Sequence, residues 1–293
     1  MQRFVYYLFR IFVGLFQFLP FWLLYAFSSG IYFLLYHVLR YRRKVVWDNL
    51  SKSFPEKSEQ ELTSISKEFY KHLTDLLVES LKGFSISEKA FLSRFSIKNT
   101  EVLTPYHQNN QSVIGLLGHY GNWEWGAMGA PFFFQQKIVA IYTPIKNPYI
   151  NNYIKKSRER FGALLCSTRD SAKALKNHKE GNSFFLLAAD QNPSNAKRAH
   201  WVDFLGRDTA TLRSTRFAQM HDLPLIFVTI AKIKRGKYLV DFKKITDSPN
   251  DYTDLELTQL FMSHLEQRIR EKPAYWLWSH KRWKHSRTKE TSQ

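Results

Sequence analysis

The sequence contains very little cysteine, and it lacks the short motifs of several common enzyme classes. Cys166 is its single cysteine, which excludes an internal disulfide and a cysteine-rich metal site and favours a reducing compartment. Because Cys166 lies in an apolar run, we expect a buried core thiol and not a nucleophile. No G-x-S-x-G, H-E-x-x-H, G-x-x-x-x-G-K-[ST] or G-x-G-x-x-G pattern occurs. We therefore expect no metal and no other cofactor.

Acidic residues are scarce compared with basic ones. The chain has 25 Asp and Glu against 43 Lys and Arg, which gives a formal net charge of +18. Such an excess favours a polyanionic partner: nucleic acid, an anionic membrane face or a phosphorylated ligand. Aromatic residues make up 16% of the chain, a level common where protein meets lipid headgroups. Hydrophobic residues make up 44%, which is enough for a sizeable core and excludes a disordered chain.

The N-terminal region has a long run without charge. No charged residue occurs between Ile11 and Leu39, a longer stretch than the roughly 20 residues that cross a bilayer. The run is too long for a signal peptide and lacks a small-residue cleavage site. Basic residues flank both ends, which favours a cytoplasmic position for both. Pro20 should interrupt a helix near the middle of the run.

Three interpretations of this run are possible. The first is a single tilted span, and the second is a shallow hairpin, 4–18 and 21–39, that enters the inner leaflet without crossing it. The third is a buried helical pair in a soluble domain. We favour membrane association without full crossing, and both membrane interpretations place the rest of the chain on the cytoplasmic side.

The remainder of the chain first has a helical pattern and then an alternating one. Residues 48–84 are helical in pattern, with Ser58 as an N-cap and Glu61 three residues later. After about Ser112, short apolar runs alternate with polar helical segments, which predicts an α/β fold: a mixed, mostly parallel sheet flanked by helices. The predicted strands are 113–118, 138–142, 163–167, 183–189 and 225–233. A further strand at 237–243 should form an antiparallel hairpin with the last of these, and 254–270 should be a late amphipathic helix.

The most informative segment for chemistry is SVIGLLGHYGNWEWGAMGA at 112–130. A strand runs to His119, a tight turn follows, and Asn122 should cap a helix with Glu124 in its first turn. Across such a turn the two side chains can meet, and a carboxylate bonded to one imidazole nitrogen leaves the other nitrogen basic. A structural turn histidine is the alternative interpretation of His119.

Several segments together resemble a known family. The strand followed by GHYGNWEW resembles the His-x-x-x-x-Asp/Glu motif of the lysophospholipid acyltransferase superfamily. Further segments resemble conserved blocks of the bacterial lipid A biosynthesis (late, or secondary) acyltransferase family, in the right order over nearly the whole chain. These segments are 142–163, 187–194, 201–218 and 275–284. One departure is Ser214, where many members have glycine, and it bears on the acyl-donor channel.

The resemblance implies transfer of a fatty acyl chain from acyl carrier protein to a hydroxyl of a lipid A precursor, at the cytoplasmic side of the inner membrane and without nucleic acid. It implies that His119 is the general base and Glu124 its orienting partner. It also implies substrate-binding residues, for which we take Arg158, Arg160, Asp190 and Asn122. The expected organisation is an N-terminal membrane anchor or helical hairpin at 1–44 and an acyltransferase domain at 45–293, with a helical layer at 48–95 and an α/β core at 112–284.

Two other functions fit the sequence. The same reaction on another acceptor, such as an aminolipid or a lysophospholipid, would use the same His119 and Glu124. A basic membrane-bound protein that binds polyanions is an alternative of another class. It predicts a basic face without a catalytic cleft, and a function that survives His119→Ala.

Overall fold

The computed structural model describes residues 1–178 and 181–287. Its helices are α1 (Gln2–Gln17), α2 (Phe21–Phe33), α3 (Arg43–Ser53), α4 (Glu59–Gly83), α5 (Glu88–Leu92), α6 (Thr104–Gln108), α7 (Trp123–Phe133), α8 (Pro148–Glu159), α9 (Ser171–His178), α10 (Arg216–His221) and α11 (Asp254–Glu271). Its strands are β1 (Phe95–Lys98), β2 (Val113–Leu117), β3 (Lys137–Tyr142), β4 (Leu164–Ser167), β5 (Ser183–Ala188), β6 (His200–Phe204), β7 (Arg207–Thr211), β8 (Leu225–Lys234) and β9 (Lys237–Thr246).

A seven-stranded sheet forms the centre of the molecule, in the order β1-β9-β8-β2-β5-β3-β4. All neighbouring pairs are parallel except β8 and β9, which form the antiparallel hairpin expected from the sequence. The predicted fold class is therefore confirmed. The sequence did not predict β1 or the separate β6–β7 hairpin. Strands this short carry little period-2 signal, so they are hard to separate from loops.

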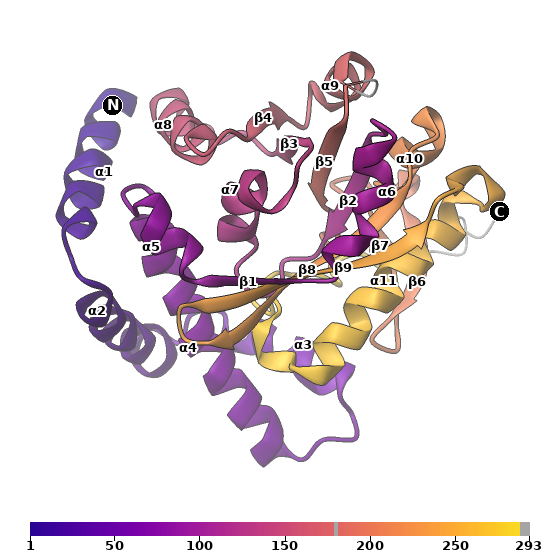
Figure 1. The fold of residues 1–293 in the computed structure, drawn as a ribbon. Coiled ribbons are helices and arrows are strands. Elements are labelled where there is room, and N and C mark those ends of the chain that lie inside the picture. The colour runs from indigo at the N-terminus through magenta and orange to yellow at the C-terminus, as the bar shows by residue number, and fades with distance from the viewer. Residues whose placement is uncertain (179–180, 288–293) are drawn as a thin grey trace.

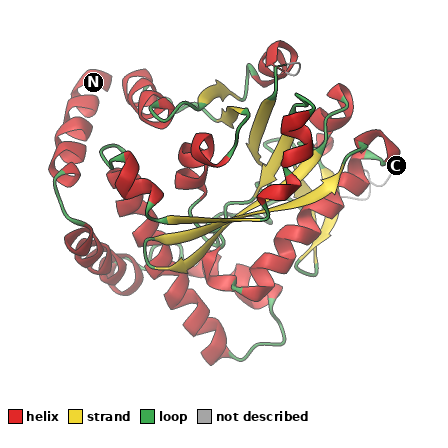
Figure 2. Ribbon diagram, in the orientation of Figure 1, coloured by secondary structure: helices red, strands yellow, loops and turns green. Residues whose placement is uncertain are grey.

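Helices cover both faces of the sheet (Figures 1 and 2). One core contains side chains of α5, α6 and α7, and the other contains side chains of α3, α4, α9, α10 and α11. Strands with both faces covered read as continuous apolar runs, and this explains why β2 and β5 stand out in the sequence.

The helical stretch predicted at 48–84 is broken between α3 and α4. The chain leaves the helix at Phe54, and Pro55 follows. Helix α4 restarts with a complete capping box, in which the Ser58 hydroxyl accepts from the Glu61 amide and the Glu61 carboxylate accepts from the Ser58 amide. The predicted N-cap is confirmed.

The two N-terminal helices lie at the edge of the molecule, outside the layers of the sheet (Figure 1). They separate at Pro20, as predicted, and Pro20 becomes the N-cap of α2. A π-helix, Leu34–Val38, continues α2 directly. Within the described ranges, the combined segment Phe21–Val38 is the one helix that is long and apolar enough to cross a membrane. The interpretation as a buried helical pair is wrong, because α1 buries only Val13 and α2 buries only Leu24 and Ser28.

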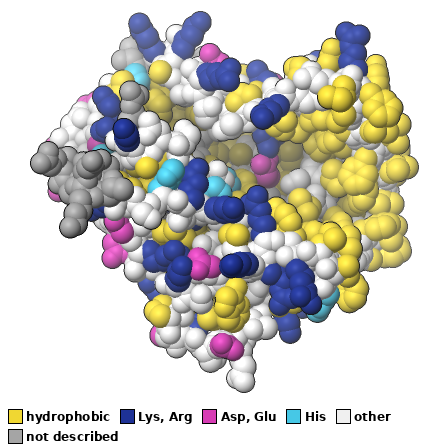
Figure 3. All heavy atoms as spheres, turned by 180° about the vertical axis from the view of Figure 1, so that it is seen from behind, with side chains coloured by type: hydrophobic (Ala, Val, Ile, Leu, Met, Phe, Trp, Pro, Cys, Tyr) yellow, Lys and Arg dark blue, Asp and Glu magenta, His cyan; other side chains and the backbone are white. Residues whose placement is uncertain are grey.

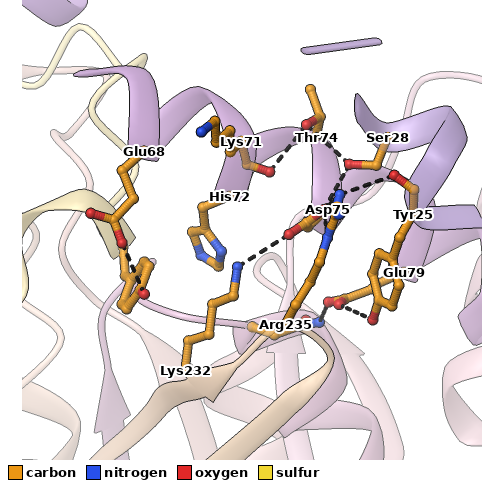
Figure 4. Close-up of polar contacts among 12 residues, drawn as sticks. Tyr25, Ser28, Glu68, Lys71, His72, Thr74, Asp75, Glu79, Lys232 and Arg235 are labelled. Carbon is orange, nitrogen blue, oxygen red and sulfur yellow. Dashed lines mark hydrogen bonds and ion pairs between the residues drawn. The ribbon is translucent and has the colours of Figure 1, made fainter. Parts of the chain in front are cut away.

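Polar contacts attach the inner face of α2 to α4 and to the β8–β9 hairpin (Figure 4). The Tyr25 hydroxyl donates to Glu79 at 2.8 Å, and the Ser28 hydroxyl donates to Asp75 at 2.7 Å. Arg235 donates to the same Asp75 carboxylate at 2.6 Å and to the Tyr25 carbonyl at 3.1 Å. Helix α2 is thus fixed along one side to the body of the molecule.

Candidate active site

The site begins where β2 ends and the chain turns into α7. Gly121 has φ of 61°, and a Cβ at this position would lie 1.6 Å from the Ile230 carbonyl oxygen. The turn therefore requires glycine both for its conformation and for its contact with β8. Asn122 caps α7 as predicted, because its side-chain oxygen accepts from the Trp125 amide at 3.0 Å.

His119 forms a hydrogen-bonded pair with Asp190. The Nδ1 atom of His119 lies 2.5 Å from Oδ1 of Asp190, and the His119 backbone amide donates to Oδ2 at 2.8 Å. Asp190 follows β5, which runs parallel to β2, so the carboxyl ends of these two strands bring the residues together. Trp276 holds the same carboxylate from behind, with its indole nitrogen 2.8 Å from Oδ2.

The expected hydrogen bond between His119 and Glu124 is therefore replaced by one with Asp190. Glu124 points instead to α8, where it forms an ion pair with Arg158. The physical reason is topological: neighbouring parallel strands place residue 190 beside residue 119, and a spacing of five residues along the chain cannot reveal such a contact.

The contacts of His119 define its tautomer. With Nδ1 donating to Asp190, Nε2 is left as an acceptor, and it lies 3.1 Å from the side-chain nitrogen of Gln191. Burial lowers the pKa of His119, but the negative charge and hydrogen bond of Asp190 and the charge of Glu124 outweigh burial and raise it above 6.5. Burial raises the pKa of Asp190, yet His119 and Trp276 together bring it down to about 2. Asp190 is therefore a carboxylate, and Nε2 is the atom positioned to accept a proton.

A cavity of about 530 Å³ opens beside this pair, at the carboxyl ends of β2, β3, β4 and β5. Its inner wall is apolar, and Arg158, Arg213 and Ser214 are among its polar lining residues. The apolar lining residues include Leu117, Met128, Ala140, Ile141, Leu165, Leu186, Leu187, Leu212 and Phe217. Figure 3 shows a hollow in the middle of one face, with hydrophobic side chains on the side of the N-terminal helices and basic side chains along much of the remaining rim.

Of the four predicted substrate-binding residues, only one lines the cavity. Arg158 lines the cavity, and Asp190 lies buried behind His119. Arg160 is directed away, since its guanidinium donates to the carbonyls of Phe84 at 3.3 Å and Ile86 at 2.5 Å. Asn122 is fully buried, with its amide nitrogen 2.7 Å from Glu79, so both ends of its side chain are already used. These contacts argue against a direct role of Arg160 and Asn122 in substrate binding.

Comparisons with known proteins identify the family. Residues 1–285 match the model of the bacterial lipid A biosynthesis acyltransferases. The chain belongs to this family. Lipid A biosynthesis acyltransferase 2 of Shigella flexneri is 27% identical over 167 residues, 56% of this chain and 52% of the relative. Lipid A biosynthesis myristoyltransferase of Escherichia coli K12 is 26% identical over 170 residues, 56% of this chain and 50% of the relative.

A longer alignment covers more of the chain. Lipid A biosynthesis lauroyltransferase of Escherichia coli K12 is 24% identical over 270 residues, 91% of this chain and 87% of the relative. For the first two relatives, the aligned part spans about half of their length. The family assignment made from the sequence is confirmed.

In this lipid A acyltransferase family member, sequence reasoning missed two residues that contact the His119–Asp190 pair. Gln191 directly follows Asp190, and Trp276 lies in the C-terminal block at 275–284. Both belong to segments that the family resemblance had marked, but no spacing rule assigned either side chain to the site.

Cys166 of β4 is half-buried against the core, and burial raises the pKa of its thiol.

Proposed function

We propose that this protein transfers a fatty acyl chain from acyl carrier protein to a hydroxyl of a lipid A precursor. The observation that carries the proposal is the His119–Asp190 pair at the wall of a largely apolar cavity, in a chain of the lipid A acyltransferase family. A base with an accepting nitrogen suits attack by a hydroxyl, and an apolar cavity suits an acyl chain.

The reaction needs only proton transfer and positioning by the protein. The acceptor hydroxyl approaches His119 in place of the Gln191 amide, and Nε2 takes its proton while the oxygen attacks the thioester carbonyl. Asp190 is a positioning residue that stabilises the resulting imidazolium. Backbone amides at the start of α7, or an arginine of the cavity, hold the negative oxygen. The thiolate then leaves and receives the proton from His119, so an ester forms and no covalent enzyme intermediate is needed.

The charges around the cavity suit both substrates. Acyl carrier proteins are acidic and lipid A precursors carry phosphates, while this chain has a net charge of +18. Arg158 and Arg213 stand among the lining residues of the cavity. An aminolipid or a lysophospholipid remains a second candidate acceptor. The hollow and the His119–Asp190 pair inside it favour an enzyme over a protein that only binds polyanions.

The N-terminal helices form the membrane-facing surface of the proposed enzyme, which acts at the cytoplasmic side of the inner membrane. Their outer side chains are large, apolar and exposed, in the manner of helices that lie in the plane of a membrane. They include Phe4, Leu8, Ile11, Phe12, Leu15, Phe18, Trp22, Phe27, Phe33, Leu34 and Val38. We assign 1–44 to membrane attachment as a shallow hairpin and 45–293 to catalysis, because polar contacts fasten the inner side of α2 to α4.

An acyl-transfer assay tests the proposal. The wild-type protein, with acyl carrier protein as donor and a lipid A precursor as acceptor, should form the acylated lipid. His119→Ala should lower kcat/KM by about 10²–10⁴-fold, the usual contribution of a general base. His107→Ala is the matched control. His107 lies in α6, forms a hydrogen bond with Asn182 and does not line the cavity. Undiminished transfer by His119→Ala would refute the mechanism, and transfer to other amphiphiles alone would change the acceptor.

A further inference from the structure

A second cavity, of about 280 Å³, lies between α4, α7 and α8. Its lining is mainly apolar, with Leu73, Leu76, Leu77, Phe84 and Ile154 among its residues. Among the described residues that line it, Glu124 and Arg158 are the only charged ones, and they are paired with each other. The chemistry of the wall therefore suits a hydrocarbon and not a polar ligand.

The two cavities converge on the residues around His119. Trp123, Glu124, Met128 and Arg158 line both cavities, so these side chains form the partition between them. The Trp123 ring lies 5.1 Å from the His119 ring, centroid to centroid. Leu277 lines the second cavity, and its backbone amide donates to the His119 carbonyl at 3.1 Å. Two hydrocarbon chains, one in each cavity, would thus end near the same imidazole.

The outer end of the second cavity lies beside the N-terminal helices. Leu77, which lines the cavity, is 46% exposed, so the cavity reaches the surface on this side of α4. Phe84, at the end of α4, lines the cavity and contacts Phe9 of α1 edge to face, with centroids 5.9 Å apart. A lipid at the apolar surface of α1 and α2 could therefore insert one hydrocarbon chain into the second cavity while its headgroup stays outside.

We infer that the second cavity binds a hydrocarbon chain of the acceptor lipid, while the first cavity binds the acyl chain that is transferred. This inference rests on the proposed function. The first cavity, the larger of the two, suits the donor, because its polar lining residues Arg213 and Ser214 can contact the group of the donor that carries the thioester. The acceptor keeps its own chains throughout the reaction, and anchoring one of them fixes the hydroxyl near the base.

Matched serine substitutions distinguish the two cavities. Ser80 of α4 and Ser157 of α8 line only the second cavity, and Ser214 lines only the first. Replacing each by phenylalanine fills one cavity and leaves the other open. Ser64→Phe, at an exposed position of α4, controls for the effect of the substitution on the helix.

The measurement is kcat/KM with a series of acceptors that share a headgroup and differ in chain length. For the wild type, kcat/KM should rise about fourfold per added methylene until the cavity is full, the factor expected for burying one CH₂. Ser80→Phe and Ser157→Phe should flatten this dependence and leave the preference for donor chain length unchanged. Ser214→Phe should do the reverse, and Ser64→Phe should behave as wild type. Equal losses for all acceptors, or a changed donor preference in Ser80→Phe, would overturn the inference.

A binding measurement keeps the inference testable if the wild type transfers nothing to these acceptors. Trp125 lines the second cavity and not the first, and a brominated alkyl chain quenches the fluorescence of a tryptophan that it contacts. The probe is a zwitterionic detergent with a brominated dodecyl chain. The part of the quenching that Trp125→Phe abolishes should also disappear in Ser80→Phe and persist in Ser214→Phe. If it persists in Ser80→Phe, the chain does not occupy this cavity, whatever reaction the enzyme catalyses.

Discussion

At the scale of single residues, the charge of Asp190 controls the basicity of His119. Because Asp190 raises the pKa of His119 above 6.5, the imidazole is protonated and inactive as a base below that pKa. We expect kcat/KM to rise with pH through the raised pKa and then to level off. In Asp190→Asn, burial remains and the main raising cause is gone, so the midpoint should move to lower pH while kcat falls by about 10²–10⁴-fold.

The pH–rate profile from pH 5 to 9 measures both effects. Asp241→Asn is the control, because Asp241 pairs with Arg268 and Asn99 outside the cavity and should leave the midpoint where it is. An unchanged midpoint in Asp190→Asn would show that this carboxylate does not act on His119.

The Glu124–Arg158 pair is expected to matter for activity more than for stability. The two side chains are 36% and 27% exposed, and ion pairs in such positions contribute about 1 kcal/mol or less to folding. Glu124→Gln should therefore change the free energy of unfolding little, yet lower kcat/KM by about tenfold or more, because Arg158 loses its position in the cavity wall. Glu124→Gln should shift the midpoint of the pH–rate profile less than Asp190→Asn does, since Glu124 contributes charge without a hydrogen bond to His119.

Thermal unfolding and kinetics of the same samples check this expectation. Glu159→Gln is the control, since Glu159 pairs with Lys155, accepts a hydrogen bond from the Leu165 amide and lines neither cavity. Should both glutamate variants retain full activity, the partition between the cavities would have no role in the reaction.

How far the sequence predicts the site depends on the range of each contact. The position of His119, the cap at Asn122 and the turn at Gly121 are local features, and the sequence predicted all three. The contact of His119 with Asp190 depends on which strands are neighbours in the sheet. Hydrophobic periodicity does not report strand order, so it cannot identify Asp190. The sequence indicated Glu124 instead, because the turn after His119 and the His-x-x-x-x-Asp/Glu resemblance both place it near the imidazole.

At the scale of elements, a buried glutamate connects four parts of the fold. Glu79 of α4 accepts hydrogen bonds from Tyr25 of α2, Asn122 at the start of α7 and Tyr238 of β9. Burial raises the pKa of Glu79 to about 7, although the tyrosine hydrogen bonds oppose this change. Glu79 thus connects α2, through Tyr25, with α7, through Asn122, and α7 is the helix that carries Glu124.

The raised pKa of Glu79 predicts how stability depends on pH. Between pH 4.5 and about 7 the folded state retains a proton that the unfolded state has released, so stability falls as pH rises through this window. The full effect is about 3 kcal/mol, at 1.36 kcal/mol per pKa unit. In Glu79→Gln this part of the pH dependence should be absent. Thermal unfolding in detergent at pH 5 and pH 8 measures it, and an equally steep fall in Glu79→Gln would assign the effect to another group.

The elements themselves were more predictable than their interactions. The strands predicted from the sequence correspond to β2, β3, β4, β5, β8 and β9. The apolar runs are most continuous in β2 and β5, where nearly every residue is buried. The break between α3 and α4 at Phe54 was missed, although Pro55 and the cap at Ser58 both mark it. Buried polar contacts such as Tyr25 with Glu79 join residues 54 positions apart, and no local pattern reports them.

At the scale of the whole molecule, the N-terminus is attached to the body that contains the site. The Arg3 guanidinium donates to the Tyr149 hydroxyl at 2.8 Å, and the Asn147 amide donates to the Gln2 carbonyl at 2.9 Å. Both partners lie at the start of α8, a helix that lines both cavities. A single span that leaves residue 2 on the far side of the membrane would break these contacts, whereas a shallow hairpin keeps them.

Labelling of single cysteines tests this arrangement. In a Cys166→Ser background, Gln2→Cys reports the position of the N-terminus and Ser286→Cys reports that of the body, since both residues are exposed. Because the two ends of the hairpin lie on one side, a membrane-impermeant maleimide should label both cysteines in inverted inner-membrane vesicles and neither in right-side-out ones. If Gln2→Cys reacts only in right-side-out vesicles while Ser286→Cys reacts only in inverted ones, the N-terminal region crosses the membrane. The contacts of Gln2 and Arg3 with α8 would then not exist in the membrane-bound protein.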